Sequence, residues 1–190
     1  FVTGNADLAA ALVEAVEGEM RARGRKIAIV CTSSTQAARD NPYGASKRAA
    51  EEALQAFAAR TGAAAHVFRL PNVFGKWCRP NYNSAVATFC HNIARSLPIQ
   101  INDPAAPVTL VYVDNVVERF IQLMDGADAA VDAEGFATVT PQYTTTVGEL
   151  ARLIETFRAS RDTLVTERVG TGLVRALYST YVSYLPPELF

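Results

Sequence analysis

The sequence has few of the residues that build disulfide frameworks and metal centres. Its 190 residues include only three cysteines and two histidines, and no pair of cysteines has the Cys-x-x-Cys spacing. An odd number of cysteines without that spacing argues against a disulfide scaffold and against a zinc knot. We therefore expect no metal in this segment and a reducing, cytoplasmic environment.

Long apolar runs and a surplus of positive charge are missing too. The longest strongly apolar stretches, residues 27–31 and 110–113, are far shorter than the roughly 20 residues of a membrane-spanning helix. The formal net charge is -1, and the basic residues form no stripe that could follow a phosphate backbone. We therefore expect neither a membrane nor a nucleic acid as a partner.

The composition that remains is that of a globular chain. Hydrophobic residues make up 49% and charged residues 19% of the sequence, and a chain of this length can bury a core. β-Branched apolar runs at residues 27–31 and 65–70 alternate with helical patterns at residues 6–23 and 42–60. Such alternation predicts an α/β fold with parallel strands and right-handed crossovers.

The second half of the sequence alternates less regularly. Tyr178, Tyr181 and Tyr184 recur every three residues, which places them on one helical face. Such a stripe is more typical of core packing than of a ligand stack. The other elements expected are a loop at 71–83, helices at 84–96, 114–124 and 146–159, a short strand near Ile99 and a strand at 109–113.

The clearest chemical signal is the segment Tyr43-Gly-Ala-Ser-Lys47. It opens a helix soon after a strand that ends in Ser33 and Ser34, and side chains four residues apart lie on the same helical face. A phenol exchanges protons poorly at neutral pH, but an adjacent fixed ammonium group favours the phenolate form. Tyr43 is therefore a candidate proton donor or acceptor, with Lys47 as its cation and a serine to orient a substrate oxygen.

Lysine is rare in this sequence. Among the 18 basic residues the lysines are Lys26, Lys47 and Lys76, and the others are arginines. Since arginine is used almost wherever only charge is needed, the retained Lys47 indicates that an ammonium group is required there. A Tyr-x-x-x-Lys spacing also occurs by chance on surface helices, so the strand and serines before it carry much of the argument.

The order of these features is similar to that of a known family. The strand-end serines, the Tyr-x-x-x-Lys helix, and the segments Arg69-Leu-Pro-Asn-Val-Phe-Gly75 and Tyr112-Val-Asp-Asn-Val116 resemble the extended short-chain dehydrogenase/reductases that act on nucleotide sugars. Residues 41–47 and 70–83 resemble the reductases of capsule and O-antigen synthesis within it. The resemblance implies an incomplete Rossmann-like parallel sheet with flanking helices, plus a small α/β substrate-binding lobe.

The resemblance also implies a domain division. Residues 1–75 would be the C-terminal half of the dinucleotide-binding domain, with the Tyr-x-x-x-Lys helix. Residues 76–190 would mainly form the substrate-binding lobe, with elements near 108–125 returning to the Rossmann core. Because the chain opens on Phe1 and no Gly-rich turn follows its first strand, we expect a fragment without the N-terminal Gly-rich half. The resemblance implies in addition that the C-terminal cupin domain of these reductases is missing from it.

The activity implied is reduction of the 4-keto group of a UDP-2-acetamido-2,6-dideoxy-hexulose with NADPH or NADH, leading to UDP-N-acetyl-L-fucosamine. The full-length protein would be a homodimer. Tyr43 would donate the proton to the 4-oxygen, Lys47 would hold the nicotinamide ribose, and Ser34 would orient the sugar oxygen. The other residues implied are Leu70, Pro71 and Val73 at the cofactor, and Ser33 and Asn72 at the substrate.

The loop that follows combines cations, aromatic rings and amides. This set suits a uracil ring and a diphosphate, with Arg79 as a candidate phosphate contact and Trp77 or Tyr82 as a stacking partner. The same residues would equally suit a packing anchor at Trp77 and a surface charge at Arg79.

The residues after the catalytic serine bear on the reaction type. In the family that the sequence resembles, sugar dehydratases carry an acidic pair directly after the strand serine, because elimination needs its own acid and base. Here Ser34 is followed by the neutral Thr35 and Gln36. Dehydration is therefore disfavoured, which leaves reduction or 4-epimerisation of a UDP-sugar. A third alternative is a catalytically inactive, truncated domain that keeps a nucleotide-sugar or partner surface.

Overall fold

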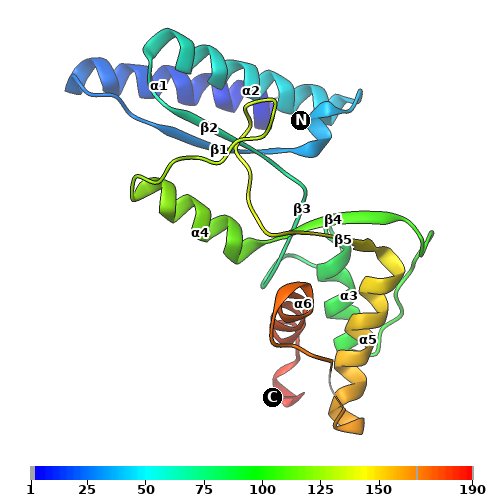
Figure 1. The fold of residues 1–190 in the computed structure, drawn as a ribbon. Coiled ribbons are helices and arrows are strands. Elements are labelled where there is room, and N and C mark those ends of the chain that lie inside the picture. Colours follow the sequence, from blue (N-terminus) through cyan, green and yellow to red (C-terminus); the bar gives the residue numbers. More distant parts are fainter. Residues whose placement is uncertain (1–2, 166, 190) are drawn as a thin grey trace. The chain divides into compact units, whose positions relative to one another are not determined.

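A computed structural model describes residues 3–165 and 167–189 and divides the chain into two compact units. Unit 1 comprises residues 1–71 and 119–139, and unit 2 comprises residues 72–118 and 140–190. Each unit contains strands of one sheet together with helices (Figure 1). The mixed α/β class expected from the sequence is therefore what the chain adopts.

Unit 1 contains a two-stranded parallel sheet. Strand β1 (Ile29–Ser34) pairs with β2 (Ala65–Leu70), and Ser34 lies opposite Leu70 at their carboxyl ends. The expected first strand at residues 27–31 is displaced toward the C-terminus, because pairing can begin only where the partner strand begins, at Ala65. The parallel pairing predicted for these two runs is confirmed.

Two long helices belong to unit 1. Helix α1 (Leu8–Arg23) follows a π-helical turn at Thr3–Asp7, and α2 (Pro42–Thr61) connects the two parallel strands. Helix α2 begins where it does because the Asn41 side chain accepts a hydrogen bond from the Gly44 amide at 2.7 Å. It ends at Gly62, whose φ of 63° is the left-handed conformation common at helix C-termini.

The core of unit 1 lies among these helices and strands. One buried cluster joins both helices to both strands and to a returning segment, with members Val13, Ile29, Leu54, Phe57, Ala63, Val67 and Phe136. The backbone of that segment also bonds to β2, since the amide of Ala137 donates to the carbonyl of Val67 at 2.8 Å. Residues from distant parts of the sequence thus hold β2 in place.

Unit 2 contains a three-stranded sheet in the order β3, β4, β5. Strand β3 (Asn72–Phe74) is parallel to β4 (Pro107–Tyr112), and β4 is antiparallel to β5 (Gln142–Thr146). The sequence reading missed β3, which is too short to show a period and lies inside the expected loop at 71–83. It also missed β5, whose threonines are good strand formers without a hydrophobic alternation.

The prediction of a short strand near Ile99 is wrong. Residues 97–101 form no strand, and Ile99 packs as a partly buried side chain on the core of unit 2. The Asn92 side chain donates to the carbonyl of Pro98 at 3.0 Å and holds this segment instead. Since Pro98 has no amide hydrogen, it cannot donate to a strand ladder.

The remaining helices match the expected patterns closely. Thr146 caps α5 by accepting a hydrogen bond from the Glu149 amide at 3.2 Å. Ser84 caps α3 in the same way through the Ala87 amide. The bounds are α3 (Ala85–Ala94), α4 (Val113–Met124), α5 (Val147–Thr163) and α6 (Gly172–Val182), with short 3-10 turns at Thr35–Ala38 and Pro187–Leu189.

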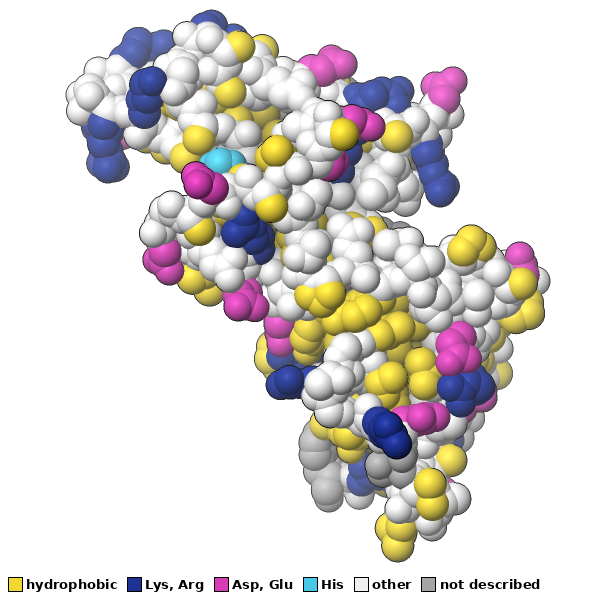
Figure 2. Space-filling view, in the orientation of Figure 1, with side chains coloured by type: hydrophobic (Ala, Val, Ile, Leu, Met, Phe, Trp, Pro, Cys, Tyr) yellow, Lys and Arg dark blue, Asp and Glu magenta, His cyan; other side chains and the backbone are white. Residues whose placement is uncertain are grey.

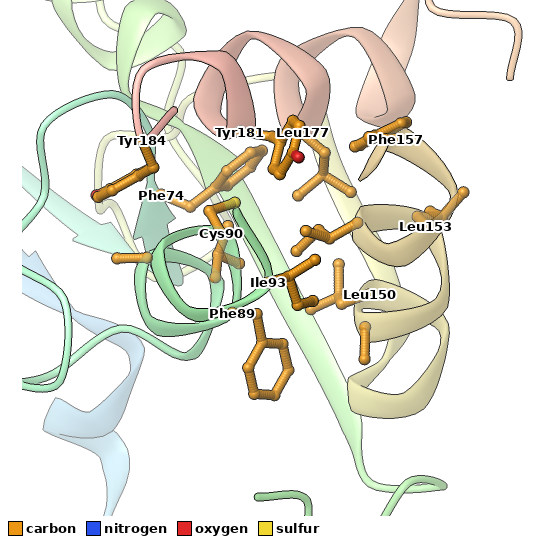
Figure 3. Close-up of a cluster of buried hydrophobic side chains, with 14 of the residues drawn as sticks. Phe74, Phe89, Cys90, Ile93, Leu150, Leu153, Phe157, Leu177, Tyr181 and Tyr184 are labelled. Atoms are coloured by element: carbon orange, nitrogen blue, oxygen red, sulfur yellow. The ribbon is translucent and has the colours of Figure 1, made fainter. Parts of the chain in front are cut away.

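The core of unit 2 lies among α3, α5, α6 and the sheet. Tyr181 and Tyr184 are buried in it, and Tyr178 packs edge-on against Phe157 with 5.3 Å between ring centroids. The tyrosine stripe is thus a packing feature. Figure 3 shows how the buried side chains converge, among them Phe74, Phe89, Cys90, Ile93, Leu150, Leu153, Phe157, Leu177 and Tyr181.

The surface carries charges of both signs. On the face shown in Figure 2, acidic and basic side chains are interspersed without one large patch of a single sign. Among the residues that the structure describes, no helix has both the length and the apolar character to cross a membrane.

Candidate active site

The carboxyl ends of β1 and β2 bring together residues predicted to meet cofactor and substrate. Ser34 and Leu70 are register partners on neighbouring strands, and the buried Pro71 follows directly. Ligands of open parallel sheets bind at such carboxyl ends. Ser34, Leu70 and Pro71 therefore lie at an edge of the sheet that could receive a ligand.

Ser34 is fixed by the backbone that follows it. Its Oγ accepts a hydrogen bond from the Gln36 amide at 3.2 Å, which caps the short 3-10 turn. That bond uses an acceptor position of the hydroxyl and leaves the O–H hydrogen to be donated elsewhere. Ser34 can therefore orient a substrate oxygen while its own oxygen is held in place.

Tyr43 and Lys47 lie one turn apart at the start of α2. The Lys47 ammonium is 5.7 Å from the centroid of the Tyr43 ring, within the range of a cation–π contact. Both side chains are half-buried. The helix start is packed tightly, because a Cβ at Gly44 would lie 2.5 Å from the carbonyl oxygens of both Gln36 and Arg39. Gly44 thus allows the start of α2 to approach the turn that follows Ser34.

A cavity of about 230 Å³ lies beside this helix in unit 1. Lys47 and Glu51 line it together with Ser33, Cys31 and apolar residues of α1. Burial raises the pKa of the Cys31 thiol, and the charge of Lys47 opposes that effect while the charge of Glu51 reinforces it. The wall of the cavity thus includes one basic side chain, Lys47, and one acidic side chain, Glu51, close to the carboxyl half of β1.

A buried ionic cluster was missed in the sequence analysis. The Glu51 carboxylate accepts a hydrogen bond from the Ser33 hydroxyl at 2.5 Å and one from Arg69 Nη2 at 2.8 Å. Glu51 is only 3% exposed and Ser33 8%. Ser33, predicted to contact the substrate, thus has its hydroxyl directed to Glu51. The sequence did contain a signal for Glu51: it follows Lys47 by four residues, as Lys47 follows Tyr43, so all three lie on the same face of the helix.

The predicted residues of β3 lie at the edge of unit 2. The Asn72 side chain donates to the carbonyl of Thr109 at 3.1 Å, so it is oriented by the neighbouring strand. Val73 is 39% exposed. Gly75, just beyond them, is required by packing, because an added Cβ would lie 2.2 Å from Cγ1 of Val113.

The loop after β3 exposes its aromatic residues. Trp77 and Tyr82 are 82% and 78% exposed, and the Arg79 guanidinium lies over the Tyr82 ring, 5.5 Å from its centroid. Tyr82 also lines a cavity of about 510 Å³ in unit 2, whose other polar walls include Gln100 and Asn102. Trp77 and Arg79 are not among the residues that line this cavity. Of the two aromatic residues predicted as stacking partners, Tyr82 lines this cavity and Trp77 does not.

Lys76 lines a second polar cavity of unit 2. Its ammonium donates to the Asp114 carboxylate at 2.9 Å, and this bond raises the pKa of Lys76. Tyr112 and Arg175 line the same cavity of about 470 Å³. Within residues 3–165 and 167–189, no three His, Cys, Asp or Glu side chains are grouped to hold a metal ion.

The family follows from comparison with known proteins. The profile described as "NAD dependent epimerase/dehydratase family" matches residues 18–137, more than half of the chain. The chain belongs to the NAD dependent epimerase/dehydratase family. This assignment confirms the resemblance seen in the sequence, and with it the Rossmann-like α/β fold class.

A curated protein and two solved structures are similar to this chain. The UDP-2-acetamido-2,6-beta-L-arabino-hexul-4-ose reductase of Pseudomonas aeruginosa is 56% identical over 191 residues, which cover 100% of this chain and 49% of that protein. The capsular polysaccharide assembling protein CapF of Staphylococcus aureus is 41% identical with a TM-score of 0.81, covering 86% of this chain and 45% of CapF.

The chain spans about half the length of these relatives. A UDP-glucose 4-epimerase of Thermotoga maritima shares the fold, with a TM-score of 0.70 at 20% identity over 93% of this chain and 67% of that one.

Proposed function

We propose that this chain carries the catalytic residues of a nicotinamide-dependent nucleotide-sugar reductase. The substrate would be the 4-keto group of a UDP-2-acetamido-2,6-dideoxy-hexulose, reduced with NADPH toward UDP-N-acetyl-L-fucosamine. The observation that carries the proposal is the 56% identity over the whole chain to a protein named as a reductase of a UDP-hexul-4-ose. The protein would act in the cytoplasm as a homodimer.

The residues at the carboxyl ends of β1 and β2 fit a nicotinamide nucleotide. Lys47 presents a three-donor ammonium group on the wall of a cavity, which suits ribose hydroxyls. Leu70 and Pro71 are buried apolar residues at the sheet edge, which suits a flat ring, and Val73 of unit 2 is the third apolar residue proposed at the cofactor. When bound, the reduced nicotinamide supplies the hydride that the carbonyl carbon receives.

The chain itself supplies the proton. Tyr43 would donate its phenolic hydrogen to the 4-oxygen as negative charge develops there, and the product is the alcohol. The Lys47 cation near the Tyr43 ring stabilises the phenolate that remains. Ser34, held by the Gln36 amide, would donate a second hydrogen bond to the same oxygen.

The nucleotide would be bound by unit 2. Tyr82 lines a cavity large enough for a nucleoside and offers its ring as a stacking surface. Arg79, which lies over that ring, would contact the diphosphate, and Asn72 would contact the sugar-diphosphate. Trp77 remains a second candidate for the stacking partner. Ser33 remains a predicted substrate contact, although its hydroxyl is directed to Glu51.

The neighbourhood of Ser34 supports reduction over dehydration. Thr35 and Gln36 form the first residues of the 3-10 turn and carry no acid or base. A dehydratase would need a separate proton donor and acceptor at this place. Thr35 and Gln36 therefore supply neither the acid nor the base that dehydration needs, whereas reduction needs only the proton that Tyr43 would give.

Replacement of Tyr43 by Phe tests the proposal. In the full-length gene product, Tyr43→Phe should lower kcat for ketone reduction by roughly 100- to 10,000-fold, because the proton donor is lost. The affinity for NADPH should change little, since the ring remains beside Lys47. Turnover is followed by NADPH absorbance and affinity by fluorescence titration.

Tyr178→Phe is the matched control. It removes a phenol that packs on Phe157 in unit 2, so turnover should stay at the wild-type level. Retained turnover in Tyr43→Phe would refute the catalytic assignment. A wild-type protein that interconverts 4-epimers without consuming NADPH would instead be an epimerase, and one that binds a UDP-sugar without any turnover would be a binding domain.

A further inference from the structure

Glu51 is a buried carboxylate that the proposed chemistry does not use. It is 3% exposed and sits on α2 one turn beyond Lys47. Burial of a carboxylate costs several kcal/mol unless partners replace the lost water. Here the partners are the Ser33 hydroxyl at 2.5 Å, and Arg69 through Nη2 at 2.8 Å and Nε at 3.1 Å.

These bonds connect three elements of unit 1 at one point. Glu51 belongs to α2, Ser33 to β1 and Arg69 to β2, and Ser33 and Arg69 are register partners in the sheet. The carboxylate therefore joins the helix that carries the proton donor to the strand end that carries Ser34. Ser34 is the next residue after Ser33, so a shift of one moves the other.

Arg69 is itself held from two further sides. Its guanidinium lies over the Phe136 ring, 3.6 Å from the centroid, and Nη1 donates to the Glu134 carboxylate at 2.7 Å. The hydrogen bond with Glu51 raises the pKa of Arg69, so the guanidinium stays charged. A planar, doubly bonded arginine fixes direction as well as distance. The Glu51 carboxylate is thus oriented and not merely neutralised.

We propose that Glu51 is a positioning residue of the reaction: through Ser33 it holds the carboxyl end of β1, and hence Ser34, in register with Tyr43 and Lys47 on α2. The inference rests on the proposed function. Stability alone is a poor reason for such a cluster, because apolar replacements of buried ion pairs are often neutral or stabilising. A fixed hydrogen-bonding geometry is what an apolar replacement cannot supply.

The test uses two variants of the full-length gene product. Glu51→Gln keeps the size of the side chain but cannot accept both hydrogen bonds of Arg69. Ser33→Ala keeps the Glu51–Arg69 pair and removes only its bond to β1. Each should lower kcat per folded molecule by roughly 10- to 100-fold, the effect of misplacing a reacting group. KM and the affinity for NADPH should stay near wild-type values.

Glu134→Gln is the matched control. It removes the carboxylate of Glu134, which binds Arg69 and is 69% exposed, and it leaves the bonds of Glu51 to Arg69 and Ser33 in place. Its kcat should fall less than that of either variant, because Arg69 keeps its bonds to Glu51 and its place over the Phe136 ring. Normalising to the folded fraction, measured by circular dichroism, separates positioning from stability, because a merely structural residue would lower the folded fraction and leave kcat per folded molecule unchanged.

A second measurement does not depend on activity. Amide hydrogen exchange over residues 29–36 should quicken by roughly tenfold or more in Glu51→Gln and Ser33→Ala, as expected when a hydrogen bond to a charged group is lost. Exchange in Glu134→Gln should quicken less than in either of these variants, because the bond between Ser33 and Glu51 remains. If kcat per folded molecule or the exchange rates match the wild type in both variants, the inference is wrong.

The outcomes separate this inference from the proposed function. A wild-type protein without ketone reduction refutes the proposed function, and the exchange data then still decide whether Glu51 holds the end of β1. A wild-type reductase whose Glu51→Gln and Ser33→Ala variants both turn over normally refutes the positioning role alone.

Discussion

At the scale of the residue, single oxygen atoms serve the fold and the chemistry together. The Ser34 hydroxyl accepts a hydrogen bond from the Gln36 amide, and its own hydrogen is the one proposed to be donated to a substrate oxygen. The neighbouring Ser33 gives its hydrogen to Glu51 instead. Two adjacent serines therefore have different hydrogen-bond partners, because successive side chains of a strand point to opposite faces of the sheet.

The buried tyrosines of unit 2 provide a stability prediction at the same scale. Among the described residues, the Tyr181 hydroxyl is the buried side-chain atom with no hydrogen-bond partner, whereas the Tyr184 hydroxyl donates to the carbonyl of Cys78. Tyr181→Phe should therefore raise the free energy of unfolding by about 1 kcal/mol, since it removes an unsatisfied polar group. Urea denaturation measures the change.

Tyr184→Phe is the matched control and should have the opposite sign. It loses a made hydrogen bond and should destabilise by about 1 kcal/mol. Burial raises the pKa of Tyr181, and raises that of Tyr184 to about 12, so both phenols are neutral at pH 7 and neither variant changes the charge. Equal destabilisation by both variants would contradict the account.

At the scale of the element, the start of α2 decides where the side chains proposed to be catalytic lie. Asn41 caps the helix, and Gly44 lets its first turn lie against the carbonyls of Gln36 and Arg39. Arg48 strengthens this packing by donating to the Arg39 carbonyl at 2.8 Å. The Tyr-x-x-x-Lys motif thus contains a glycine that is needed for the helix position and not for the chemistry.

Gly44→Ala should disturb this arrangement. The added Cβ would lie 2.5 Å from two carbonyl oxygens, so the helix start must move, and overpacking of this kind costs about 1–3 kcal/mol. Chemical denaturation should show that loss, and turnover should fall because Tyr43 is the adjacent residue.

Gly18→Ala, in the middle of α1, is the control for helix propensity. An added Cβ there has no neighbour within 4 Å, so the alanine should stabilise by about 0.5–1 kcal/mol. If both glycine variants change stability in the same direction, close packing at Gly44 is not the cause.

At the scale of the whole molecule, the proposed functions divide between the two units. The proposed proton donor Tyr43 and the cation of Lys47 belong to unit 1, and the cavity with Tyr82 belongs to unit 2. The affinity for UDP should therefore depend on unit 2 residues alone. Tyr82→Ala should weaken UDP binding by roughly 5- to 100-fold, the range for losing an aromatic ring under a base, as measured by calorimetry.

Two controls make that result specific. Trp77→Ala removes an exposed ring that does not line the cavity, and UDP affinity should hardly change. Tyr43→Phe, in unit 1, should also leave UDP affinity unaltered. A large loss in Trp77→Ala would transfer the stacking role to Trp77, and an unchanged Tyr82→Ala would refute a nucleotide at this cavity.

Much of this arrangement could be predicted from local sequence. The Tyr-x-x-x-Lys spacing, the serines at the end of β1, and the helices that begin near residues 42 and 146 depend on residues within a few positions of each other. The parallel pairing of the first two strands followed from strand and helix alternation. These features could be predicted because their physical causes, periodicity and capping, act over one or two turns.

The features that escaped prediction join distant residues. Strand β5 is defined by its pairing with β4, Arg69 finds Glu134 across 65 positions of sequence, and Tyr82 acquires a cavity from residues 100–106. None of these leaves a local pattern.

The sequence by itself determined the family, the α/β class and the side chains of the proposed proton transfer, because residue type and spacing carry that chemistry. Only the tertiary structure decided that Ser33 faces Glu51 while Ser34 keeps its hydrogen, and that Tyr82 rather than Trp77 lines a cavity. The physical reason is that the direction of a side chain and the partner of a buried charge depend on packing between segments far apart in the sequence.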